Sequence, residues 1–133
     1  MPRLPSVNPV LEAHVTAELL RLSVKYDCEP PSFTWEDLGD IPAVMSMGSL
    51  GVNKRWGEIF LLDPIRTPHM MSYVLAHEFR HWMTYAKHLP IPLPRGPKWR
   101  EKRREYSEMV ATEFARQETG ITDEDYLKWS REL

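Results

Sequence analysis

The sequence predicts an α+β domain: an N-terminal helix, a small and mainly antiparallel sheet of about three strands, and three further helices. Apolar residues recur at helical spacing over residues 9–26, and the later part of the chain has helix-start and helix-end signals at Thr67-Pro68, Gly120 and Thr122. Between them, residues 43–64 combine strand-forming residues with glycine and asparagine. The chain has 133 residues, which suits one compact domain with one core, residues 1–133.

The first helix is expected to begin at Asn8-Pro9, with Asn8 as N-cap and Pro9 at the first helical position. Its apolar face is formed by residues three or four apart: Leu11, Val15, Leu19, Leu22 and Tyr26. Pro30 and Pro31 stop the helix, and residues 32–35 are expected to start a short strand.

Two more strands are expected at residues 43–47 and 56–62. Gly48, Gly51 and Asn53 lie between them and supply residues typical of turns. Pro64 closes the second of these strands, so the three short strands together predict the sheet.

The second half of the chain is expected to be helical. Thr67-Pro68 opens a helix that runs to about His88, and a proline-rich loop follows it. A helix over residues 98–119 is closed by Gly120 in the C′ position. Thr122 caps a last helix whose first turn is acidic, as the helix dipole prefers.

Composition restricts the possible partners. The formal net charge is -2, which gives no general attraction to nucleic acid or acidic membranes. Cys28 is the single cysteine, so an intrachain disulfide and a cysteine-rich zinc site are excluded. The first residues lack the apolar run of a signal peptide, and no segment reaches the roughly 18 apolar residues of a membrane span. We therefore expect a cytoplasmic protein, monomer or dimer, without membrane or nucleic-acid partners.

The most informative motif is His77-Glu78-Phe79-Arg80-His81. Two histidines four positions apart share one face of a helix, roughly 6 Å from each other, and can bind one zinc ion. Glu78 follows the first histidine and is placed to act as a general base rather than as a ligand. Apolar residues flank the motif and predict burial, where these polar groups would be costly without a partner. This pattern is typical of zinc peptidases.

A third protein ligand is required, because two histidines alone do not make a tight zinc site. Glu108 on the next long helix is the best candidate. Ala111 and Ala115 share its face, and such small side chains would let that helix approach the histidines. Glu105, Glu113 and His88 are the alternatives: the first two resemble ordinary surface charges, and His88 lies two turns beyond His81.

The stretch from Glu108 to Ala115 resembles the Glu-x-x-Ala-x-x-Phe-Ala signature that follows the His-Glu-x-x-His helix in ImmA/IrrE-type gluzincins. The short chain and its order of elements are also similar to the minigluzincins, which are described as self-inhibited zymogens. The resemblance implies that Glu108 is the third zinc ligand and that residues 57–62 form the edge strand that pairs with substrate. Thr112 departs from the family pattern, which has Asn or Asp there.

Together these features predict a zinc metallopeptidase that cleaves a peptide or protein substrate through a zinc-activated water, with Glu78 as general base. Two alternatives stay open. One is a latent enzyme whose own C-terminal segment, residues 123–133, occupies the cleft as an inhibitor. The other is a non-catalytic zinc-containing domain that binds peptides or has a regulatory role, for which a general base would be unnecessary.

Overall fold

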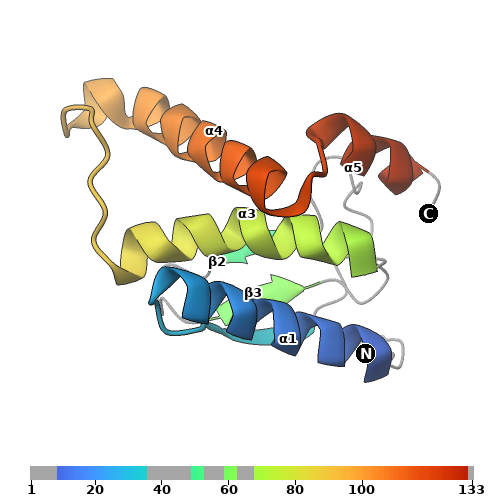
Figure 1. Ribbon diagram of the computed structural model, residues 1–133. Helices are drawn as coiled ribbons and strands as arrows, with labels where there is room; N and C mark the ends of the chain where they lie inside the picture. Colours follow the sequence, from blue (N-terminus) through green and yellow to red (C-terminus); the bar gives the residue numbers. More distant parts are fainter. Residues whose placement is uncertain (1–8, 36–48, 53–58, 63–67, 132–133) are drawn as a thin grey trace, which may run out of the picture.

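The computed structural model describes residues 9–35, 49–52, 59–62 and 68–131 (Figure 1). The N-terminal half contains α1 (Pro9–Tyr26), β1 (Ser32–Trp35), β2 (Ser49–Val52) and β3 (Ile59–Leu62). The C-terminal half contains α3 (Pro68–Ala86), the short 3-10 helix η1 (Pro97–Trp99), α4 (Arg100–Thr119) and α5 (Asp123–Arg131).

Helix α1 follows the predicted apolar period. Its buried residues are Leu11, Val15, Leu19 and Leu22, and this face packs on α3. The helix ends at Tyr26 because Asp27 takes a left-handed conformation, with a φ of 49°. The Lys87 ammonium donates to the carbonyl oxygen of Tyr26 at 2.9 Å, which satisfies one of the carbonyls exposed at a helix C-terminus.

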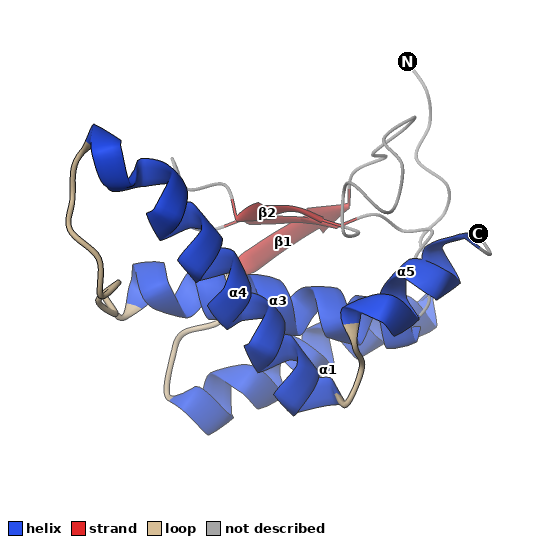
Figure 2. Ribbon diagram, turned by 90° about the horizontal axis from the view of Figure 1, so that it is seen from above, coloured by secondary structure: helices blue, strands red, loops and turns tan. Residues whose placement is uncertain are grey.

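Helix α3 is the central element. It contacts α1, α4, α5 and β2; Figure 1 shows it running between α1 and α4, and Figure 2 shows α4 crossing over it. Apolar residues surround most of its circumference, as expected for a helix buried in a core. The buried apolar set is Met70, Met71, Tyr73, Val74, Leu75, Ala76, Phe79, Trp82 and Met83.

The predicted α+β class with a mainly antiparallel sheet is wrong. Helices make up most of the described residues, and the described buried core comes from helices and the segments that follow them. The strands have four residues each, too few to form a layer comparable with α3. Their order is β1-β3-β2, with β1 parallel and β2 antiparallel to β3. The fold is predominantly helical, with a small mixed sheet beside α3.

The individual strands also differ from expectation. The strand at residues 32–35 is confirmed as β1, and only the end of the predicted strand 56–62 is described, as β3. Ser49–Val52 forms β2 where turn residues had been expected, and its pairing with β3 is irregular. The predicted strand 43–47 lies outside the described residues. Because β3 is central, the expectation that residues 57–62 form a free edge is wrong.

The predicted ends of the last two helices are confirmed. Gly120 closes α4 in the left-handed region, with a φ of 72°, and its N–H donates to the Arg116 carbonyl at 2.8 Å. Thr122 caps α5: its hydroxyl accepts the Asp125 N–H at 3.1 Å, and its own N–H donates to the Asp125 carboxylate at 3.2 Å. Helix α3 ends at Ala86, slightly before His88, which has a φ of 50°.

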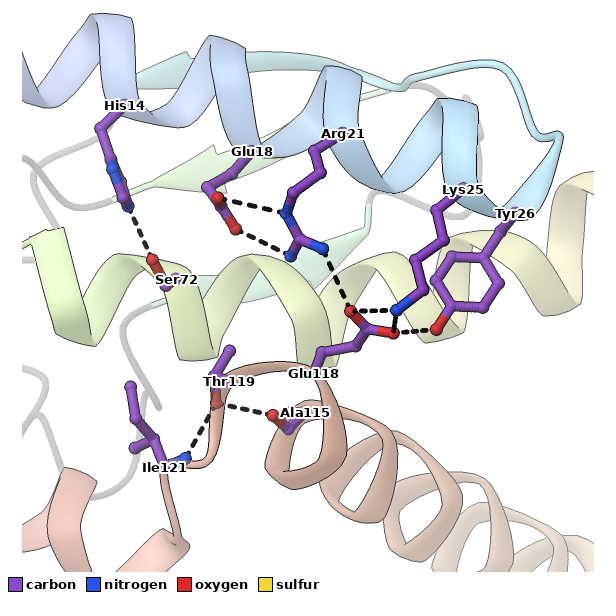
Figure 3. A network of polar contacts seen from close by, with 10 residues as sticks. All are labelled: His14, Glu18, Arg21, Lys25, Tyr26, Ser72, Ala115, Glu118, Thr119 and Ile121. Atoms are coloured by element: carbon purple, nitrogen blue, oxygen red, sulfur yellow. Dashed lines mark hydrogen bonds and ion pairs between the residues drawn. The ribbon is translucent and has the colours of Figure 1, made fainter.

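A buried carboxylate ties α4 to α1 (Figure 3). The Glu118 side chain is only 5% exposed and lies 3.2 Å from the Arg21 guanidinium and 3.0 Å from the Lys25 ammonium. The Tyr26 hydroxyl donates to the same carboxylate. Three donors from one helix therefore hold the end of α4 against α1.

Replacement of this carboxylate is expected to destabilise the fold. Glu118→Ala should lower the free energy of unfolding by about 1–3 kcal/mol, since buried hydrogen bonds to a charged group are lost. The loss stays moderate because Arg21 and Lys25 are 40% and 55% exposed and can be hydrated. Urea unfolding measures the change, with Glu113→Ala on the exposed face of α4 as control. Equal stability of the two variants would contradict the role of Glu118.

Candidate metal centre

Helix α3 presents His77 and His81 together on one face, one turn apart. Their ring centroids are 5.0 Å apart and their planes are inclined at 72°. His77 is buried, with 5% of the residue exposed, because the surrounding α3 side chains pack into the core. His77 is thus buried, as the apolar residues around the motif predicted, and the His81 side chain is 11% exposed.

Helix α4 brings Glu108 to both histidines. The His77 Nε2 atom lies 3.1 Å from one carboxylate oxygen, and the His81 Nε2 atom lies 3.0 Å from the other. The close approach is possible because Ala111 and Ala115, on the inner face of α4, are fully buried and small. One potential ligand atom from each of the three residues lies within 4.8 Å of the others, so this group could hold a metal ion.

The donor atoms fit a cation better than a set of protein hydrogen bonds. The His81 Nε2 atom is buried and, within the described part of the chain, has no partner with hydrogen-bond geometry, although Glu108 is close. A buried nitrogen in this state is costly. Binding its lone pair to a metal ion would satisfy it, as it would the converging His77 nitrogen and Glu108 oxygens.

The charge of Glu108 also suits a cation. Its hydrogen bond with His77, followed in importance by the close approach of His81, holds the pKa of the Glu108 carboxyl well below its usual range. Partial burial opposes this effect but does not reverse it. The carboxylate is thus ionised, and its side chain is 56% exposed, so the centre opens to solvent beside α4.

A residue that sequence reasoning missed supports His81 from behind. The Ser107 hydroxyl oxygen lies 3.2 Å from His81 Nδ1, the ring nitrogen not directed at Glu108. A partner of this kind fixes the orientation of a metal-binding histidine and determines which nitrogen is free to bind. The sequence offered only a weak indication of this role, because Ser107 is simply a hydroxyl residue directly before the candidate ligand Glu108.

The alternative third ligands lie elsewhere. The Glu113 carboxylate is engaged by the Arg116 guanidinium, at 3.1 Å from Nε, and by the Gln117 amide at 3.2 Å. Glu105 is exposed, and the exposed His88 follows the end of α3. Neither glutamate nor His88 belongs to the metal-binding group that the described residues form.

Glu78 is buried next to this group, with 6% of the residue exposed. One position along an α-helix turns a side chain by about 100°, so Glu78 and His77 leave α3 in different directions. Glu78 is not part of the metal-binding group. Glu78 is therefore a buried carboxylate on the same helix as the two histidines, outside the set of possible ligands.

A cavity of about 760 Å³ adjoins the centre. Its described wall contains Arg80 from α3 and a run of α4 residues that begins with Glu108: Met109, Val110, Thr112, Glu113, Phe114 and Gln117. Burial lowers the pKa of the Arg80 guanidinium, with a smaller opposing influence from Tyr106. Glu108 is the member of the metal-binding group that lines this space, which is large enough for part of a peptide.

Comparison with protein-family models, curated proteins and solved structures finds no match to this chain. The similarity to gluzincins therefore depends on the sequence pattern alone. Among the described helices, none is long and apolar enough to cross a membrane. Fold and site define a predominantly helical protein whose His77, His81 and Glu108 could hold a metal ion.

Proposed function

We propose that this protein is a zinc-dependent peptidase in which His77, His81 and Glu108 bind the metal and Glu78 is the general base. The observation that carries the proposal is the approach of two Nε2 atoms to a single carboxylate, at 3.1 and 3.0 Å. The buried Glu78 follows the first histidine directly on the same helix. This combination is the one expected of a hydrolytic metal centre of the gluzincin type.

The donor set favours zinc. Two imidazoles and one carboxylate suit zinc, whereas calcium and magnesium prefer sites made of oxygen atoms. Three protein ligands leave a fourth position open, as in catalytic rather than structural zinc sites. A structural site would also have no use for the adjacent carboxylate of Glu78.

When bound, zinc would act as a Lewis acid that polarises a peptide carbonyl and lowers the pKa of water to about 7. Glu78 would accept the proton from the attacking water and deliver it to the leaving amine. Its burial limits the water around the carboxylate and strengthens electrostatic interactions there. Ser107 would keep the His81 ring in its binding orientation.

An extended substrate would pair with β2 rather than with β3. Strand β3 has a neighbour on each side, so its backbone groups are already engaged. Among the strands that the structure describes, β2 lies at one edge of the sheet and contacts α3. Addition of a peptide strand at this edge would supply backbone hydrogen bonds beside the helix that bears the histidines.

The latent enzyme and the non-catalytic zinc domain are the competing proposals. The Trp129 ring of α5 lies 6.3 Å from the ring of His69, in the first turn of α3. This contact holds α5 at the opposite end of α3 from His81. The buried Glu78 favours an enzyme over the non-catalytic domain, whereas a latent enzyme would have the same Glu78.

Metal removal tests the proposal. Incubation with 1,10-phenanthroline should abolish cleavage of a fluorogenic peptide library, and stoichiometric zinc should restore it, because the metal is required for the chemistry. Magnesium added at the same concentration is the control and should restore nothing. Cleavage that survives complete metal removal would rule out the proposed enzyme, and zinc binding without any cleavage would favour the non-catalytic domain.

A further inference from the structure

Arg80 stands directly beside the candidate metal centre. It precedes His81 on α3 and shares the wall of the 760 Å³ cavity with Glu108. Its guanidinium donates to the Thr84 hydroxyl oxygen at 2.7 Å, one turn further along the helix. This contact holds the partly buried side chain along α3 and leaves other guanidinium donors for the cavity.

The charge of Arg80 is not balanced by a carboxylate of the described residues. Elsewhere in the protein, Arg21, Arg104 and Arg116 each form an ion pair with a glutamate. Among the described residues, the Arg80 guanidinium donates a hydrogen bond only to the hydroxyl group of Thr84. A partly buried cation without a counter-charge is costly, and it gains most when an anion enters the adjoining space.

The acidic residues of the cavity do not remove this charge. The Glu113 carboxylate is engaged by Arg116 and Gln117, and Glu108 is directed at the two histidines. The rest of the wall includes apolar side chains, among them Met109, which is 59% exposed. The cavity therefore combines one available cation with apolar surface.

We propose that Arg80 binds a carboxylate of the substrate, so that the site selects peptides with a negative charge close to the bond that is cleaved. This inference rests on the proposed peptidase function. The planar guanidinium suits a carboxylate, because two parallel N–H groups can donate to its two oxygens. The carboxylate can be an Asp or Glu side chain or the C-terminus of the peptide.

The position of Arg80 limits where this charge lies in the substrate. Arg80 and the ligand His81 are consecutive residues, and an extended peptide advances only about 3.3–3.6 Å per residue. Because Arg80 also shares a cavity wall with Glu108, a carboxylate held by Arg80 would be within a few residues of a peptide bond at the metal centre. Selectivity of this kind would appear for a single position of the peptide.

Binding of labelled peptides tests the inference without cleavage. Zinc-loaded Glu78→Gln protein is titrated into three pools of one randomised fluorescent peptide: fixed Asp with a C-terminal amide, fixed Asn with an amide, and fixed Asn with a free C-terminus. Fluorescence anisotropy gives the dissociation constants. One acidic pool should bind about 10- to 100-fold more tightly than the neutral pool, as expected for hydrogen bonds between charged groups. The Asp pool and the free-C-terminus pool distinguish the two sources of the carboxylate.

Substitution of Arg80 completes the test. Arg80→Met, added to the Glu78→Gln protein, keeps the apolar stem of the side chain. In this double variant, the ratio of the dissociation constants of the neutral and acidic pools should fall to nearly one. Arg104→Met, which removes the same charge from an exposed ion pair, should leave the preference intact. Equal binding of all pools, no binding of any pool, or a preference that survives Arg80→Met would overturn the inference. Zinc content and cleavage of the neutral pool by the unmodified protein are measured in parallel, so failure of the peptidase proposal is recognised separately.

Discussion

A Glu78→Gln variant is expected to lose peptide cleavage by about 10²- to 10⁴-fold while retaining its zinc. The amide has nearly the shape of the carboxylate but cannot accept a proton from water. Since Glu78 lies outside the metal-binding group, its replacement should leave His77, His81 and Glu108 in place. The ratio of kcat/KM values measures the first expectation, and metal analysis after dialysis measures the second.

Glu113→Gln is the matched control for this substitution. It makes the same chemical change on α4, at an exposed carboxylate that is paired with Arg116. Its cleavage rate should stay near that of the unmodified protein. If Glu78→Gln cleaves as fast as this control, Glu78 is not the general base. If Glu78→Gln loses its zinc, Glu78 is instead required for metal binding or for a stable fold.

The helices were predictable because their signals are local. The apolar period of α1 marks the face that packs on α3, and Thr122 with Asp125 forms the cap of α5. Gly120 ends α4 because a residue without Cβ adopts its left-handed conformation at little cost. Each of these signals lies within a few residues of the element that it defines.

The sheet was not predictable to the same degree, because strand pairing is not local. Strand β1 pairs with β3 in parallel, across a long stretch of intervening chain. The residues of β1 and β3 do not indicate that β3 lies at the centre of the sheet rather than at its edge. The glycine in β2 also favoured a turn, although this segment pairs with β3.

The residues of the candidate site also divide into those that local sequence signals predict and those that only the packing of the helices brings together. Helical spacing alone places His77 and His81 on one face, so both could be proposed from the sequence. Glu108 comes 31 residues after His77, and only the packing of α4 on α3 brings them together. Ser107 and Arg80 follow no sequence pattern. Their importance depends on what each side chain meets in three dimensions.

A Glu108→Ala variant is expected to lose nearly all of the zinc that the unmodified protein retains after dialysis. Removing a residue that only supports a ligand already weakens metal binding 10- to 100-fold, and loss of the ligand itself should exceed that. The two histidines left behind do not make a tight site. Because the Glu108 side chain is 56% exposed, its removal should leave the core packed, and the variant should remain folded.

Metal analysis per chain, with circular dichroism to check folding, measures this loss. Glu105→Ala and Glu113→Ala remove the alternative carboxylates of α4 and should each leave the zinc content unchanged, since neither residue belongs to the metal-binding group. Zinc lost from one of these controls but retained in Glu108→Ala would move the third ligand to that residue. Zinc absent from the unmodified protein would mean that Glu108 serves His77 and His81 only as an ion-pair partner.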